Sequence, residues 1–301
     1  MRRVVLITNP HAARNKPNVV RTVTSELERE ACQVEVVPTS GPGDATRIAR
    51  AAVDDGVDIV TVYGGDGTIM QAVKGMIGQR VPLGIIPGGT GNLLAGNLKL
   101  SRSPKKAART VARGVKRTID VGRAETSEGA RFFAVACGAG YDAEIMAATS
   151  GQAKRRWGMG AYMARVVTTV RALSPTPFAI TVDDEPIQLD AVMVLVANCQ
   201  HIMPPFLSLG PSVTLDDGVL DVVALSADGL LQAAWVVWQL AWHHPDGPHI
   251  VRRRGHTVRI ECEPAQPVQL DGEPGGTTPF TASIVPRGLD VIVPKSHGTA
   301  S

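Results

Sequence analysis

Two glycine-rich turns are the part of this sequence with the clearest chemical meaning. The turn GGDGT (64–68) follows the apolar run VDIVTVY, and the turn PGGTGN (87–92) follows VPLGII. Glycines at such positions let backbone N–H groups approach phosphate oxygens, and a helix that begins near Thr68 would point the positive end of its dipole the same way. Because Asn9 ends an earlier strand-like run, the two turns and Asn9 together predict a binding site for nucleotide phosphates.

Asp66 is the unexpected residue in the first turn, because a carboxylate repels a phosphate. The chain has no G-x-x-x-x-G-K-[ST] sequence and no G-x-G-x-x-G after its first strand, so a Walker lysine is missing. A hydrated Mg²⁺ shared by Asp66 and the phosphates of a nucleotide would remove the repulsion. The alternative left open is that Asp66 caps a helix over 67–79.

Two acidic groups in the second half of the chain, LDDGVLD (215–221) and QLDGE (269–273), could complete such a site. Phosphoryl transfer to an alcohol needs a metal ion and an acceptor for the hydroxyl proton, and that acceptor is usually an Asp. Asp271 and Glu273 would share one face of a strand, unless a turn at Gly272 separates them. A tight Asp-Gly turn explains either group structurally, so only their combination with the phosphate turns gives them functional weight.

The elements that must position these residues change character part-way along the chain. In the first part, strand-like and helical patterns alternate with short links, which predicts a doubly wound parallel sheet. The carboxyl ends of its strands would collect both glycine turns and Asn9 at one edge. The strands are expected at 2–9, 33–39, 57–64 and 81–89, and the helices at 17–31, 44–56 and 68–76.

Beyond residue 122, short strands dominate. A strand and glycine turn over 131–144 and a helix over about 152–173 precede closely spaced strands from residue 178 to the end. This spacing predicts an antiparallel sheet or sandwich. We therefore predict an α/β domain over 1–122, a β-rich domain over 123–301, and a ligand site in a cleft between them.

The bulk composition describes a globular protein with no strong bias. Its formal charge of +3 is too small to indicate nucleic-acid binding. The scattered cysteines predict buried, reduced thiols. The apolar core of the first residues, Val4–Ile7, is far below the ~7–15 residues of a signal peptide, and the run at 230–242 is shorter than the ~20 residues of a membrane span. We predict a cytoplasmic protein that meets the inner membrane face only peripherally.

Six motifs follow one another along the chain. They are NPHAA (9–13), GGDGT (64–68), PGGTGN (87–92), CGAGYDA (137–143), DDGVLD (216–221) and QLDGE (269–273). Their order resembles that of the diacylglycerol kinase catalytic family, which includes soluble bacterial diacylglycerol kinases, YegS-like lipid kinases, sphingosine kinases and ceramide kinases. The resemblance covers essentially the whole chain. It implies an ATP-dependent kinase for a lipid hydroxyl, with a phosphofructokinase-like α/β domain and a β-rich second domain.

The resemblance also implies roles for single residues. Asp271 would be the general base that takes the proton of the lipid hydroxyl. Asp66 and Glu273 would belong to the network around Mg²⁺ and ATP. Asp217 would bind a structural Mg²⁺ together with the backbone carbonyls of Thr214 and Val219.

The implied nucleotide contacts come from the first domain and from Glu273. They are Asn9, Pro10, His11, Ala12, Ala13, Thr39, Gly64, Gly65, Asp66, Gly67, Thr68, Gly89, Thr90, Asn92 and Glu273. Two departures from the family pattern stand out. Ala12-Ala13 replaces Ser-Gly and removes a hydroxyl contact to phosphate, and Leu93 replaces an Asp that bacterial members often carry.

Diacylglycerol, reached at the membrane surface and converted to phosphatidate, is the substrate that we expect first. The alternatives are another lipid alcohol, as in YegS-like or sphingosine kinases, an NAD kinase with the same GGDGT turn, or an inactive regulator. Trp235, Trp238 and Trp242 would line one stripe of a helix, either in the core or at a membrane interface. The basic runs at 154–156 and 252–254 would suit anionic lipid or simply water, and a homodimer stays open.

Overall fold

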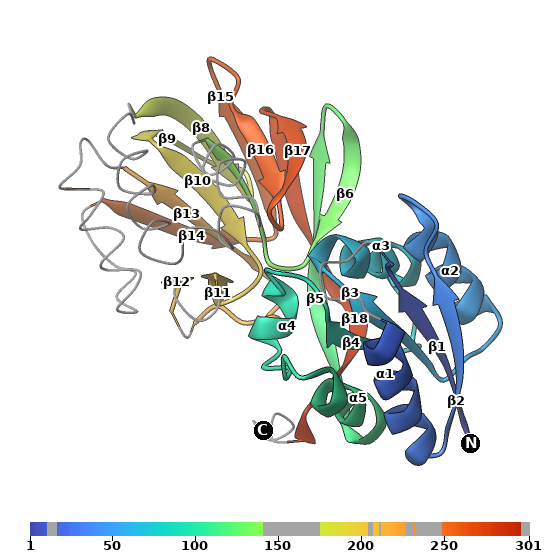
Figure 1. Ribbon diagram of the computed structural model, residues 1–301. Coiled ribbons are helices and arrows are strands. Elements are labelled where there is room, and N and C mark those ends of the chain that lie inside the picture. Colours follow the sequence, from blue (N-terminus) through green and yellow to red (C-terminus); the bar gives the residue numbers. More distant parts are fainter. Residues whose placement is uncertain are drawn as a thin grey trace. The chain divides into compact units, whose positions relative to one another are not determined.

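The computed structural model describes residues 1–10, 17–140, 175–203, 207–210, 212–226, 232 and 249–295. The chain divides into two compact units (Figure 1). The first contains Met1–Asp120 and the segment from Pro286 onward, and the second contains Val121–Val285. The division lies close to the predicted boundary at residue 122. The segment from Pro286, which the sequence placed in the second domain, clusters with the first unit.

The sheet of the first unit is parallel, as predicted from the strand–helix alternation. Its strand order is β2-β1-β3-β4-β18, and β18 (Phe280–Val293) joins β4 through the pair Val291–Leu83. The four N-terminal strands are β1 (Arg2–Thr8), β2 (Cys32–Pro38), β3 (Ile59–Gly64) and β4 (Leu83–Pro87). Strands β3 and β4 are buried along their whole length, which explains their unbroken apolar sequences.

Helices cover both faces of this sheet. The helices are α1 (Pro17–Arg29), α2 (Asp44–Asp54), α3 (Asp66–Met76), α4 (Leu93–Asn97) and α5 (Pro104–Arg113). Helix α1 packs on α5, and α2 packs on α3. Val4 and Leu6 of β1 share a core with the α1–α5 pair. Val5 and Ile7 therefore face α2 and α3, because side chains alternate along a strand.

The described strands of the second unit form two larger antiparallel sheets and the short pair of β11 (His201–Met203) and β12 (Leu207–Ser208). One has the order β14-β13-β10-β7-β16-β17, and the other contains β15, β8, β9 and the first half of β18, with β5 and β6 attached. The strands are β5 (Val115–Thr126), β6 (Gly129–Phe133), β7 (Ala136–Gly140), β8 (Thr176–Val182), β9 (Glu185–Ala191), β10 (Met193–Ala197), β11 (His201–Met203), β12 (Leu207–Ser208), β13 (Leu220–Leu225), β14 (Ile250–Gly255), β15 (Thr257–Cys262), β16 (Pro267–Leu270), β17 (Glu273–Thr277) and β18 (Phe280–Val293). Residues of both sheets share one core, with Phe178 and Ile260 from one and Val194 and Val222 from the other. This is the predicted sandwich.

Strand β18 is the last strand of the chain, and its residues from Pro286 onward belong to the first unit. Pro286, Arg287 and Gly288 lie in its middle, and in sequence they resemble a break between strands. The strand nevertheless continues through them, with a left-handed Arg287 (φ +51°) whose N–H donates to the Asp120 carboxylate at 2.6 Å. One left-handed residue within a continuous strand therefore replaces the loop that the residue types suggest.

Several sequence-based expectations concern residues outside the described ranges. They are the helix over 152–173, the basic run at 154–156, the tryptophan stripe and the residues His11, Ala12 and Ala13. Among the described helices, none combines the length and apolar character that crossing a membrane requires. The four cysteines are buried and free, as predicted.

Candidate active site

The two glycine turns of the first unit touch through their backbones. The Gly88 N–H donates to the Gly64 carbonyl at 2.8 Å. A Cβ atom added at Gly89 would lie 2.7 Å from the Cα of Gly65, and one at Gly88 would lie 2.9 Å from the ring of Tyr63. Only glycine fits these positions, so the carboxyl ends of β3 and β4 form a cradle of bare backbone, as phosphate binding requires.

Asp66, in the first turn, forms hydrogen bonds with the end of the second turn. Its two carboxylate oxygens accept the N–H groups of Asn92 and Leu93, both at 2.7 Å. Asn92 is left-handed (φ +54°), and its side chain accepts from the Gly89 N–H at 3.0 Å and donates to the Gly89 carbonyl at 2.8 Å. The carboxylate in the first turn thus orders the second turn.

The alternative that Asp66 is the cap residue of the following helix is wrong. The cap residue of α3 is Gly65, whose extended backbone makes no side-chain cap bond, and Asp66 is the first residue of the helix itself. A carboxylate in the first turn still favours the helix dipole. Its hydrogen bonds to Asn92 and Leu93 serve the start of α4, which is distant in sequence and invisible to local pattern.

The end of β1 is linked to the same turn. The Asn9 side chain donates to the Thr68 hydroxyl at 3.0 Å, and its backbone N–H donates to the Tyr63 carbonyl at 3.4 Å. A Cβ atom at Gly64 would lie 3.0 Å from that of Thr68. The structure therefore brings together Asn9, Thr68 and the glycines of both turns, as the sequence predicted.

The other predicted nucleotide contacts of this unit lie around the cradle. Thr90 is exposed in the second turn, and Gly67 lies in the first turn of α3. Thr39 follows β2, and its N–H donates to the Thr8 carbonyl at 2.8 Å. Pro10 is the last residue before the undescribed segment. Their nucleotide contacts stay predictions.

Asp271 lies in a two-residue turn between β16 and β17. Asp271 (φ +48°) and Gly272 (φ +85°) are both left-handed, and Leu270 pairs with Glu273 across the hairpin. This geometry is the tight Asp-Gly hairpin turn that the residue types allow. The turn separates Asp271 from Glu273, so the two carboxylates do not share a strand face.

Three backbone N–H groups hold the Asp271 carboxylate. They come from Ala134, Val135 and Ala136, at 2.7, 2.8 and 2.9 Å, and the Asp271 N–H returns a bond to the Ala136 carbonyl at 2.9 Å. Successive N–H groups that converge on an anion stabilise its charge. The link between β6 and β7 therefore presents three N–H donors to the Asp271 carboxylate, in a position that no side-chain motif could reveal.

The thiol of Cys137, the next residue along β7, takes no part as a thiolate. Burial raises the pKa of Cys137 well above its usual range, and the negative charge of Asp271 raises it further. The thiol stays protonated beside the carboxylate. The predicted role of Asp271 as proton acceptor stays a prediction.

Glu273 is exposed and pairs with Arg131 of β6 at 3.3 Å. Arg131 also donates to the carbonyl of Pro274. Both interactions lie within the second unit. The predicted place of Glu273 in a Mg²⁺–ATP network stays a prediction.

Asp217 has a cationic partner within the chain. The guanidinium of Arg254 contacts its carboxylate and also lies 3.3 Å from Asp221, which Arg252 approaches at 3.3 Å as well. Burial raises the pKa of Asp221 above its usual value, while the two arginines act in the opposite sense. Two residues of the basic run at 252–254 are thereby committed to ion pairs.

A separate Mg²⁺ at this loop would have to share Asp217 with Arg254. The other Asp217 oxygen accepts the Val219 N–H at 3.3 Å. No cluster of three or more His, Cys, Asp or Glu side chains suited to a metal occurs in the described part of the chain. The Mg²⁺ predicted at Asp217, Thr214 and Val219 therefore stays a prediction that competes with an arginine.

Comparison with known proteins identifies both units. Residues 3–124 match the diacylglycerol kinase catalytic domain, and residues 135–293 match the YegS C-terminal NAD kinase beta sandwich-like domain. A diacylglycerol kinase of Mycobacterium tuberculosis is 31% identical over 98% of this chain and 96% of its own length. A diacylglycerol kinase of Bacillus subtilis is 29% identical over 98% of this chain and 97% of its own.

A solved structure shows the same fold. The crystal structure of a diacylglycerol kinase from Bacillus anthracis superimposes with a TM-score of 0.75 at 23% identity, over 97% of this chain and 96% of that one. The mixed α/β domain and the β-rich domain are therefore both confirmed as features of a known architecture.

Proposed function

The chain belongs to the diacylglycerol kinase family of lipid kinases, and on that premise we propose that it transfers the γ-phosphate of ATP to a lipid hydroxyl, with diacylglycerol as the substrate and phosphatidate as the product. The observation that carries the proposal is the cradle of the first unit. Gly65 and Gly89 are in backbone contact, and Asp66 holds the second turn in place through two N–H groups.

ATP would place its phosphates on this cradle. The bare N–H groups of the turns and the dipole of α3 are suited to anionic oxygens. A Mg²⁺ that arrives with ATP would neutralise phosphate charge near Asp66, since a carboxylate that accepts two N–H groups keeps further lone pairs. Asp66 then has two functions, because it orders the turn and balances the charge of the incoming cation.

Asp271 would act on the lipid. The lipid hydroxyl oxygen attacks the γ-phosphorus, the bond from that phosphorus to the ADP oxygen breaks, and the hydroxyl proton moves to the carboxylate. An ionised carboxylate is required for this step, and the three N–H groups that converge on Asp271 would stabilise its negative charge. The proton afterwards passes to water.

The substrate class places the reaction at a membrane surface, because diacylglycerol does not leave the bilayer in useful amounts. We propose that the protein works peripherally at the cytoplasmic face of the membrane. The second candidate is a kinase for another lipid alcohol, which the match of residues 135–293 to the YegS domain favours.

A transfer assay with labelled ATP and Mg²⁺ tests the proposal directly. Diacylglycerol, monoacylglycerol, phosphatidylglycerol, sphingosine and NAD are offered separately in detergent micelles or buffer. We expect label in phosphatidate. Label in another lipid alone would move the chain to the second candidate.

Two results of the same assay would overturn the proposed class. Label in NAD alone would identify an NAD kinase, and no label in any acceptor would identify a regulator without catalysis. ATP binding measured by calorimetry separates these outcomes from a misfolded preparation, because a folded cradle still binds the nucleotide.

A further inference from the structure

One segment of the first unit carries a larger net positive charge than the chain as a whole. Residues 99–117 contain eight Lys and Arg residues and no Asp or Glu. Subtracting this +8 from the +3 of the chain leaves −5 for the other residues. The basic residues are Lys99, Arg102, Lys105, Lys106, Arg109, Arg113, Lys116 and Arg117.

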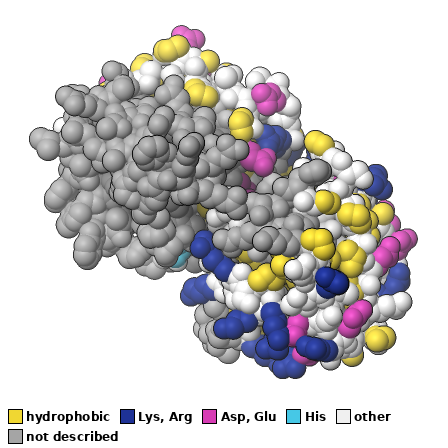
Figure 2. Space-filling view, viewed as in Figure 1, with side chains coloured by type: hydrophobic (Ala, Val, Ile, Leu, Met, Phe, Trp, Pro, Cys, Tyr) yellow, Lys and Arg dark blue, Asp and Glu magenta, His cyan; other side chains and the backbone are white. Residues whose placement is uncertain are grey.

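The basic side chains of helix α5 lie on its exposed face. Its buried residues are Ala107, Ala108, Val111 and Ala112, which belong to the core shared with α1. Its four basic residues are exposed. Figure 2 shows Lys and Arg side chains gathered over the region where Figure 1 places α5 and α1.

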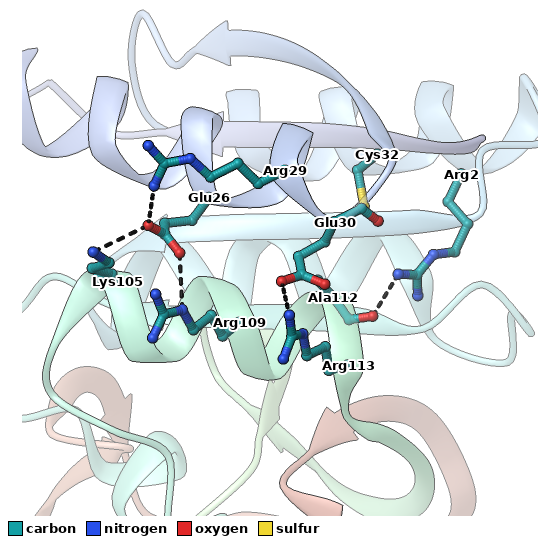
Figure 3. A network of polar contacts seen from close by, with 9 residues as sticks. All are labelled: Arg2, Glu26, Arg29, Glu30, Cys32, Lys105, Arg109, Ala112 and Arg113. Carbon is teal, nitrogen blue, oxygen red and sulfur yellow. Dashed lines mark hydrogen bonds and ion pairs between the residues drawn. The ribbon is translucent and has the colours of Figure 1, made fainter.

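Ion pairs hold part of this charge in place without balancing it. Glu26 of α1, with a side chain only 4% exposed, contacts Lys105 at 3.3 Å, Arg109 at 2.9 Å and Arg29 at 2.9 Å (Figure 3). Burial raises the pKa of Glu26, but the hydrogen bonds from Arg109 and Lys105 outweigh it, so the pKa lies below its usual value. Glu30 also pairs with Arg113 at 2.6 Å, and Asp290 pairs with Lys116 at 3.0 Å. Three carboxylates thus face the eight basic residues of the segment and Arg29, so a surplus of positive charge remains.

The helices on the other face of the sheet show no such surplus. Helices α2 and α3 together carry three acidic and three basic residues, whereas α1 and α5 together carry two acidic and six basic residues. The asymmetry is therefore a property of one face. A merely soluble surface would mix both signs on both faces.

We propose that residues 99–117, the basic α5 surface, bind the protein to bilayers that contain anionic phospholipid. The inference rests on the proposed function only for the need to reach a membrane. A cluster of four to eight basic residues on an amphipathic helix is the pattern that anionic lipid headgroups attract. The segment has no aromatic residue on which nucleic-acid bases could stack, which favours a headgroup layer over a single strand.

The test is vesicle sedimentation of the full chain without ATP. Vesicles of phosphatidylcholine alone are compared with vesicles that also contain phosphatidylglycerol, at low and high salt. The test variant changes Lys99, Arg102 and Lys106 to Gln; within the described part of the chain these exposed residues take part in no ion pair. The matched control changes Arg50, Lys74 and Arg80, which are exposed near α2 and α3.

We expect the unmodified protein to bind only the anionic vesicles and to be released by salt. The test variant should bind about a hundredfold more weakly, since each basic residue near the surface contributes roughly fivefold. The control variant should bind as the unmodified protein does. Matching thermal unfolding curves of all three proteins exclude misfolding.

Three results would overturn the inference. They are equal binding of the two variants, equal binding to neutral and anionic vesicles, or binding to duplex DNA as strong as to the anionic vesicles. The labelled-ATP assay in detergent micelles needs no bilayer, so failure of the proposed kinase activity and failure of this surface are separate results.

Discussion

Two hairpins of the second unit hold an aspartate in the same way, although only one belongs to the proposed site. Asp183 (φ +45°) begins the turn between β8 and β9, and Asp271 (φ +48°) begins the turn between β16 and β17. The Asp183 carboxylate accepts the N–H groups of His256 and Thr257, at 2.9 and 2.8 Å. The Asp271 carboxylate accepts those of residues 134–136.

The difference between the hairpins lies in their surroundings. The Asp183 side chain is 40% exposed and also contacts the His256 ring at 3.1 Å. Asp271 is less exposed, and lies beside a buried thiol that stays protonated. A left-handed aspartate whose carboxylate accepts backbone N–H groups of a neighbouring segment thus stabilises a hairpin turn. The general-base role proposed for Asp271 rests on its motif and on the family resemblance, and its local geometry adds three N–H donors to the carboxylate.

The sharpest test of this comparison exchanges both aspartates for asparagine. Asp271→Asn should lower the turnover of lipid phosphorylation by about 10³ and leave ATP binding largely intact, because the proton acceptor is lost. Asp183→Asn should keep normal turnover. Initial rates with labelled ATP measure both.

Equal losses in the two variants would show that turnover follows hairpin stability and would remove the general-base assignment. Near-normal turnover of Asp271→Asn would do the same. Chemical denaturation of the two proteins supplies the control, since both variants turn an amide NH₂ toward a backbone N–H donor.

Asp66 extends the comparison to the first unit, where a carboxylate again binds backbone N–H groups. Asp66→Asn should weaken ATP binding by about tenfold or more and destabilise the fold by about 1–3 kcal/mol, because one N–H group of the second turn loses its acceptor. Calorimetric ATP titration and denaturant unfolding measure the two effects. Unchanged ATP affinity would show that the cradle does not bind the nucleotide.

Asp217 differs from Asp66, Asp183 and Asp271, because its carboxylate forms an ion pair with the guanidinium of Arg254. Chelation with EDTA should leave the unfolding temperature unchanged, since Arg254 already supplies the positive charge. Arg254→Gln should destabilise the fold by about 1 kcal/mol, the upper part of the range for partly exposed pairs. A fall in unfolding temperature on chelation alone would instead establish a structural metal ion at this loop.

The pH dependence of the Asp183 hairpin should be the smallest effect. Burial raises the pKa of Asp183, but hydrogen bonds from the His256 and Thr257 backbone outweigh it, so the pKa lies below the usual 3.8. The stabilisation is therefore complete above the usual pKa and is lost as the pH falls through the lowered value. Asp183→Asn should reduce the loss of unfolding free energy at acid pH. An unchanged loss in this variant would show that other carboxylates cause it.

Much of the fold was predictable because it depends on local periodicity. The first four strands and the helices between them lie within a few residues of their expected positions, since apolar runs and helical spacing record which face is buried. The predicted helix over 17–31 ends at Arg29, before a left-handed Ala31 (φ +57°) that no spacing reveals. The return of β18 was missed because Pro286 and Gly288 resemble a break.

The residue types of the site can be read from the order of amino acids alone. GGDGT, PGGTGN and QLDGE contain its glycines and carboxylates, and the order of these motifs along the chain indicates the family. The partners of the carboxylates, in contrast, become visible only in the folded protein. Asp66 binds the second glycine turn, Asp271 binds the link before β7, and Asp217 binds an arginine of β14. Two of these partners are peptide N–H groups, which every residue but proline carries, so their positions follow from folding and leave no mark in the order of side chains.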